Sequence, residues 1–134
     1  MNQGFLLAFA FLGVAMLAFR SYQGHREDST ITKNETSVAL LLQAAVEENQ
    51  KLKTQTGNYA RELGTLDSFR RAEFIGAIQA FDFSYRNASD SFSISANPRQ
   101  PGKTGLHYFY VNQTGVRRYD AIRPAGQSSH TLPQ

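Results

Sequence analysis

The sequence predicts an α+β protein in which an N-terminal transmembrane helix precedes a long helix packed on a four-stranded antiparallel meander sheet. Residues 4–19 carry no charged side chain, and residues 34–56 repeat apolar side chains at helical spacing. From residue 81 onward, apolar and polar residues alternate. We therefore divide the chain into a transmembrane anchor (1–22), a stem (23–33), a globular domain (34–121) and a C-terminal tail (122–134).

The first segment, residues 4–19, reads GFLLAFAFLGVAMLAF. As a helix its 16 residues span roughly 24 Å, against a bilayer core of about 30 Å, and polar neighbours such as Arg20 and Tyr22 can extend it into the interface. A removable signal peptide would need a basic start and a small-residue cleavage site, and a buried core helix would be amphipathic. We therefore expect a retained anchor.

Small residues along the anchor predict close packing against other transmembrane helices. The residues expected to anchor the chain or to pack there are Gly4, Phe5, Ala8, Phe9, Gly13, Ala15, Ala18 and Arg20. Basic residues follow the anchor and none precedes it. The positive-inside tendency taken alone would therefore put the globular domain in the cytoplasm.

A helix is expected over residues 34–56, with Asn34 as its N-cap and Gly57 ending it in a left-handed conformation. The side chains at helical spacing are Val38, Leu41, Leu42, Ala45, Val46, Asn49 and Leu52. A second, short helix is expected from residue 67 or 68 to about residue 80. Its inward side chains are expected to be Ala72, Ile75 and Ile78.

Strands are expected at 81–86, 91–96, 106–111 and 116–119, with a loose end or a laid-down arm from residue 122. The third strand is apolar on both faces, so we expect it to be central and covered by the long helix on one side. Leu106, Tyr108 and Tyr110 share one face, and Phe109 and Val111 share the other. Two interpretations stay open: these side chains are core, or Tyr108, Phe109, Tyr110 and Val111 form a protein contact.

Composition and spacing argue against catalysis. The chain has no cysteine, which excludes disulfides and thiolate metal sites. Its three histidines, at 25, 107 and 130, lack metal-ligand spacing, and the serines at 91, 93 and 95 have no local His–Asp partner. We expect no enzymatic activity, no cofactor, no metal and no small-molecule substrate. The net charge of +3 is too small to predict binding to nucleic acid.

Two stretches resemble type IV pilins and pseudopilins. The first, residues 34–66, reads NETSVALLLQAAVEENQKLKTQTGNYARELGTL, and the second, residues 81–119, contains the P-G-x-T-G turn and the Q-T-G hairpin. The resemblance covers about residues 30–126. It implies a pilin-like fold in a single-pass protein of the bacterial inner membrane, with the globular domain in the periplasm or outside the cell. We give the resemblance more weight than the positive-inside tendency.

The N-terminus differs from that family. Pilins are cut between a glycine and a phenylalanine after a basic leader, and they carry a glutamate a few residues further on. Gly4 and Phe5 form the candidate processing site here, but the leader MNQ has no basic residue and no acidic residue precedes Glu27. These differences favour a stationary accessory subunit over a processed filament subunit.

The function that we expect is a non-enzymatic structural subunit of a larger membrane complex, of a respiratory or photosynthetic type for example. Its partners would be membrane lipid and other transmembrane subunits or copies of itself. One alternative is a processed type IV pilus or secretion pseudopilus subunit. A second is a membrane-tethered module for DNA or another polyanion, in which aromatic side chains lie beside basic ones. Its basic residues would be Arg99, Lys103, Arg117 and Arg118.

Overall fold

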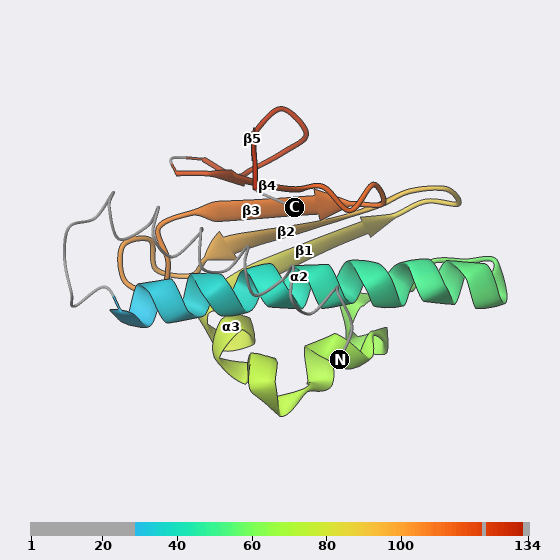
Figure 1. The fold of residues 1–134 in the computed structure, drawn as a ribbon, viewed down its shortest axis with the longest axis horizontal. Helices are drawn as coiled ribbons and strands as arrows, with labels where there is room; N and C mark the ends of the chain where they lie inside the picture. The colour runs from blue at the N-terminus through green and yellow to red at the C-terminus, as the bar shows by residue number, and fades with distance from the viewer. Residues whose placement is uncertain (1–28, 122, 133–134) are drawn as a thin grey trace.

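The computed structural model describes residues 29–121 and 123–132, and shows one long helix lying along one face of a five-stranded antiparallel sheet (Figure 1). The helix is α2 (Ser29–Thr56). The strands are β1 (Phe81–Asn87), β2 (Phe92–Pro98), β3 (Tyr108–Asn112), β4 (Arg117–Asp120) and β5 (His130–Thr131). Each strand pairs with the next along the chain, so β3 is central and β1 and β5 are the two edges.

Helix α2 buries one stripe of side chains, which includes Val38, Leu41, Leu42, Ala45 and Val46. It ends at Gly57, whose φ of 86° is the left-handed conformation expected there, and the Gly57 N–H donates to the Lys53 carbonyl oxygen at 2.8 Å. The helix already runs from Ser29, so Asn34 is not its cap. Asn34 Nδ2 instead donates to the Thr104 carbonyl oxygen at 3.0 Å.

Between α2 and the sheet, the chain forms three short 3₁₀ turns, at 63–65, 67–70 and 72–74, and then the short helix α3 (Ile75–Ala80). Of the expected inward side chains, Ile78 packs against the core, but Ala72 and Ile75 are exposed, and Phe74, Ala77 and Ala80 are buried instead. A 3₁₀ turn takes about 3.0 residues, against about 3.6 in an α-helix. A helical period counted from residue 67 is therefore out of phase by the time the chain reaches α3.

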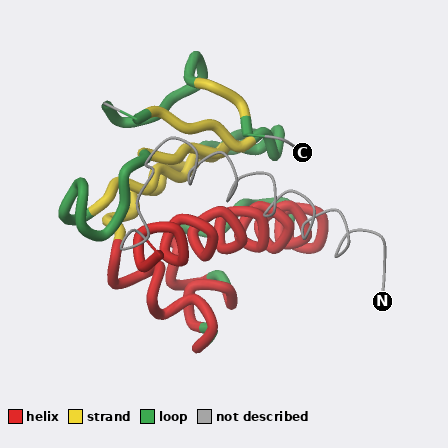
Figure 2. Tube along the Cα trace, turned by 60° about the vertical axis from the view of Figure 1, so that its left-hand side comes forward, coloured by secondary structure: helices red, strands yellow, loops and turns green. Residues whose placement is uncertain are grey.

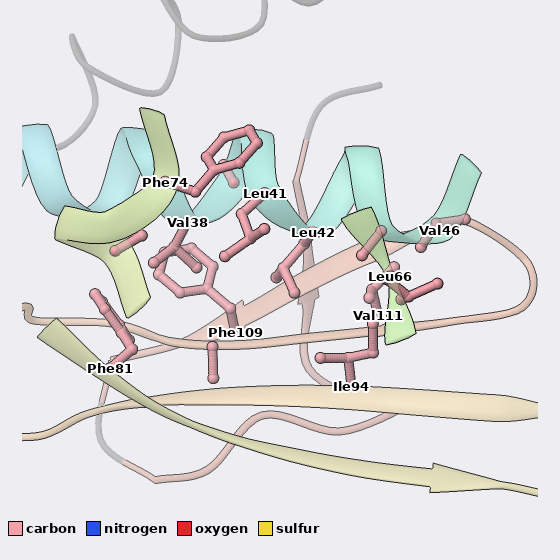
Figure 3. Close-up of a cluster of buried hydrophobic side chains, with 14 of the residues drawn as sticks. Val38, Leu41, Leu42, Val46, Leu66, Phe74, Phe81, Ile94, Phe109 and Val111 are labelled. Atoms are coloured by element: carbon pink, nitrogen blue, oxygen red, sulfur yellow. The ribbon is translucent and has the colours of Figure 1, made fainter. Parts of the chain in front are cut away.

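The core lies between α2, α3 and the inner face of the sheet. Side chains from β1, β2 and β3 meet those of α2 there, with Phe81, Ile94, Phe109 and Val111 each at most 1% exposed (Figure 3). The Phe81 and Phe109 rings lie 6.0 Å apart between centroids. The predicted alternation along the third strand is therefore confirmed for its inward side chains.

The predicted fold class, however, is wrong as a whole. The sheet has five strands and not four, because β5 pairs with β4 in the register Arg118↔Thr131 and Tyr119↔His130. The long helix also starts before its predicted residue. Of the helices in the described residues, none has both the length and the apolar character to cross a membrane. The predicted anchor, at 1–22, lies outside the described residues.

Of the two alternatives for the C-terminal tail, a loose end or a laid-down arm, the described residues up to 132 fit the second. The Leu132 N–H donates to the Arg117 carbonyl oxygen at 2.8 Å, and the Leu132 side chain, only 4% exposed, joins the core. A strand of two residues is too short to produce a recognisable alternation, so periodicity could not predict β5.

Candidate functional site

The outer face of the sheet is not covered by any helix that the structure describes. Successive side chains of a strand point to opposite faces, and Phe109 and Val111 pack toward α2, so Tyr108 and Tyr110 point away from it. Figure 2 shows the described helices on one side of the strands. The side chains of this surface, which we call the open face, are Asp82, Ser84, Arg86, Ser93, Ser95, Asn97, Tyr108, Tyr110, Arg118 and Asp120.

Two tyrosines form the centre of the open face. Tyr110 lies between Ser95 on β2 and Arg118 on β4, and Tyr108 lies opposite Asp120. Both tyrosines are half-buried. Arg118 is held by β5 and the turn before it, because its Nη1 donates to the Ser129 carbonyl oxygen at 3.0 Å and to Thr131 Oγ1 at 2.9 Å. The open face therefore presents aromatic rings at its centre and a guanidinium group in a constrained position.

Charges on the open face have mixed signs. Asp82 pairs with Arg99, whose Nε lies 3.2 Å from Asp82 Oδ1, and the other charged side chains of this face are Arg86, Arg118 and Asp120. The basic residues of the polyanion alternative do not converge either, since Arg117 is buried on the inner face and Arg118 is on the outer one. The described open face therefore carries two acidic and two basic side chains and no continuous basic patch.

Arg117 has a structural role. Its Nη1 donates to the Ala39 carbonyl oxygen at 3.3 Å and to Gln43 Oε1 at 3.2 Å, which joins β4 to α2. Burial lowers the pKa of the Arg117 guanidinium, and the charge of Glu47 opposes that shift. An arginine side chain stays protonated in proteins, so this residue keeps its charge inside the domain.

Glu35, on α2, fastens the loop that leads into β3. Its carboxylate is fully buried, and Oε2 accepts hydrogen bonds from the backbone N–H groups of Leu106 at 2.8 Å and His107 at 2.6 Å. His107 Nδ1 lies 3.1 Å from the same oxygen. In this loop Gly105 lies against the Phe81 ring, where a Cβ would come within 2.6 Å of Phe81 Cζ. The Glu35 carboxylate therefore binds the loop that leads into β3.

Asn49 fastens the segment that follows α2. Its Oδ1 accepts from the Ala60 N–H at 2.7 Å and its Nδ2 donates to Tyr85 Oη at 3.0 Å, while Tyr85 Oη donates to the Ala60 carbonyl oxygen at 2.6 Å. The three groups form a closed hydrogen-bonded triangle between α2, β1 and the intervening segment. Desolvation by burial raises the pKa of the Tyr85 phenol, although the hydrogen bond from Asn49 opposes the shift.

The raised pKa of Tyr85 predicts a loss of stability at alkaline pH. The folded protein holds the phenol proton more tightly than the unfolded chain, so this contribution is complete below a pH of about 10 and is lost as the pH rises through the folded-state pKa. Urea unfolding at pH 8 and above pH 10 should show Tyr85→Phe less stable than wild type at pH 8, with a smaller difference at the higher pH. A constant difference at both pH values would contradict this assignment.

A polar cavity of about 330 Å³ lies between the segment after α2 and the β1–β2 turn. It is lined by Asn58, Tyr59, Arg61, Asn87, Ala88 and Ser89. This lining has amide, hydroxyl and guanidinium groups but no carboxylate or imidazole. In the part of the chain that the structure describes, no three residues among His, Cys, Asp and Glu are grouped so that they could hold a metal ion.

The residues predicted for the anchor, the processing site and the protein contact lie in different parts of the chain. The anchor and packing residues, including the candidate processing site at Gly4 and Phe5, lie outside the described residues. Four residues were given two interpretations, core or protein contact, and Phe109 and Val111 among them are in the core. Tyr108 and Tyr110 lie on the open face. The links made by Glu35 and Asn49 were not predicted, because no local pattern connects residues so far apart in the sequence.

Together, the fold and the open face describe a small α+β protein with a one-sided antiparallel sheet and a candidate contact surface. A scan against protein-family models gave no match to this chain. Searches of the curated proteins and of the solved structures also found no similar protein.

Proposed function

We propose that the protein is a non-enzymatic structural subunit that is tethered to a membrane by residues 4–19 and presents its open face to another protein of a larger complex. The observation that carries this proposal is the pair of half-buried tyrosines, Tyr108 and Tyr110, at the centre of a sheet face that no described helix covers. Tyrosine and arginine are enriched at the centres of protein interfaces. Arg118 lies directly beside Tyr110.

The hydrogen bonds made by the buried polar side chains support a structural role for the protein. The Glu35 carboxylate fastens the β3 loop, Asn49 fastens the segment after α2, and Arg117 joins β4 to α2. These bonds hold the sheet against the helix layer, which makes the open face a stiff surface. A stiff surface loses little conformational entropy when a partner binds to it. The sequence resemblance to pilins and pseudopilins supports a domain outside the cytoplasm.

The test compares the full-length chain with the double variant Tyr108→Ala/Tyr110→Ala in membranes of its source cells. After extraction in a mild detergent, the wild type should migrate on a native gel with other protein subunits. The double variant should stay in the membrane fraction but migrate as a released subunit. Ile75→Ala is the matched control, because Ile75 is an exposed apolar side chain on α3, among the helices on the other side of the sheet.

Three outcomes would contradict the proposal or change it. Recovery of the wild-type chain in the soluble fraction would exclude a membrane tether. Release by Ile75→Ala but not by the tyrosine variant would move the contact away from the open face. N-terminal sequencing that finds Phe5 as the first residue would favour the alternative of a processed filament subunit.

A further inference from the structure

Strand β1 is an edge of the sheet, and its free side carries unused backbone groups. Two backbone hydrogen bonds just beyond the ends of β1 show which of its residues bond to β2. The Arg99 N–H donates to the Ala80 carbonyl oxygen at 3.0 Å, and the Ala88 N–H donates to the Ser91 carbonyl oxygen at 2.8 Å. Hydrogen-bonded pairs recur at every second residue of an antiparallel ladder. The even-numbered residues of β1 therefore bond to β2, and the N–H and C=O groups of Phe83 and Tyr85 point outward.

This edge carries two charged side chains, Asp82 and Arg86, but none of the backbone features that block pairing. Those features are prolines, bulges and very short strands. Strand β1 has seven residues, no proline and an uninterrupted register with β2, whereas the opposite edge, β5, has two residues. Among the described residues, no hydrogen bond outside the strand ladders involves the backbone of Phe83 or Tyr85. An edge of this length and regularity is suited to another strand.

We propose that β1 pairs with β1 of a second copy of this chain, antiparallel, about a two-fold axis at Ser84. Ser84 is the middle residue of the strand, so all seven residues of one copy would face the seven of the other. Phe83 of each copy would exchange backbone hydrogen bonds with Tyr85 of the other. Ser84 would lie opposite Ser84 in a pair without backbone hydrogen bonds.

The charges select this register. With the axis at Ser84, Asp82 of each copy lies opposite Arg86 of the other, on the open face. The Asp82 side chain is 69% exposed, and Arg86 is exposed and forms no ion pair with another described residue. An axis at residue 82 or 86 would put like charges opposite each other. An axis at residue 83 or 85 would put both charges opposite neutral residues, so only the central register is complementary.

In this arrangement both faces of the sheet would continue from one copy into the other. The even-numbered side chains of both copies would extend the open face, and Phe83 and Tyr85 would meet on the inner side, where the Phe69 ring already packs edge-on against Phe83 at 5.1 Å between centroids. The inference goes beyond the proposed function, because it uses the edge of β1 and not the two tyrosines. It does not depend on what the open face binds.

A single engineered thiol tests the pairing, because the chain contains no cysteine. In the full-length Ser84→Cys variant, in mild detergent, the two thiols would lie in a pair without hydrogen bonds, with Cα atoms about 4.5 Å apart. That distance is within disulfide range. Mild oxidation should therefore convert most of the protein into a covalent dimer.

Ser95→Cys is the matched control. Ser95 lies on the same face and pairs with Ser84 in register, one strand further in. In the proposed dimer the two Ser95 positions are three strand spacings apart, roughly 14 Å, so they should not form a disulfide. Equal cross-linking of the two variants, or none with Ser84→Cys, would overturn the proposal.

Exchanging the charges gives a second test. Arg86→Asp should weaken the dimer at least about tenfold, because two attractive cross-strand pairs become two repulsive ones. The double variant Asp82→Arg/Arg86→Asp should restore association, measured by light scattering over a range of concentrations. An unchanged dimer in Arg86→Asp would count against this register. Adding Tyr108→Ala/Tyr110→Ala to Ser84→Cys should leave the cross-link intact, which separates this inference from the proposed function.

Discussion

Replacing Glu35 by alanine is expected to lower the free energy of unfolding by about 3–5 kcal/mol. The substitution removes the acceptor of the Leu106 and His107 backbone N–H groups and the partner of the His107 ring. Because this site is buried, water cannot easily replace the lost acceptor. Urea unfolding followed by circular dichroism measures the loss, and amide hydrogen exchange at residues 106 and 107 should become faster.

Two further variants make this result specific. Glu35→Gln keeps one acceptor oxygen, so it should lose less stability than Glu35→Ala. Glu47→Ala removes an exposed carboxylate from the same helix and should change stability by no more than about 0.5 kcal/mol. If Glu35→Ala is as stable as Glu47→Ala, the carboxylate does not hold the β3 loop in place.

Phe109→Ala is expected to cost about 3–5 kcal/mol, because it opens a cavity in the core between β3 and α2. A loss of this size is a large part of the usual stability of a small domain, about 5–15 kcal/mol. The adjacent substitution Tyr110→Ala is the matched control, since Tyr110 is half-buried on the open face. It should cost clearly less, about 1 kcal/mol, and should affect partner binding more than folding.

Thermal and urea unfolding of Phe109→Ala and Tyr110→Ala, each compared with wild type, measures the two losses of stability. The contrast between two neighbouring aromatic residues tests which face of β3 the core covers. Similar losses for Phe109→Ala and Tyr110→Ala would mean that a further element covers the open face, and would remove the main support for a contact there.

The alternation of side chains predicted much of the sheet. It assigned Phe109 and Val111 to one face of the third strand and Tyr108 and Tyr110 to the other, and the structure confirms that division. The reason is local, because a pleated strand sends successive side chains to opposite sides whatever surrounds it. The end of α2 was also predictable, since Gly57 adopts the positive φ that glycine tolerates best.

Other features depend on contacts that no local pattern contains. Glu35 and His107 are 72 residues apart in the sequence, and the carboxylate has a partner only because the sheet packs on α2. Ala72 and Ile75 are exposed and not inward as predicted, because 3₁₀ turns change the phase of the helix. The two residues of β5 form a strand only because β4 offers an unpaired edge.

The sequence alone therefore indicated four of the five strands and which of their side chains share a face, since these properties follow from the backbone geometry of a few neighbouring residues. It did not specify the fifth strand, the buried Glu35 or the free edge of β1. Those arise only when distant segments meet, because a hydrogen bond or an unpaired strand edge depends on what lies beside it in space and not along the chain.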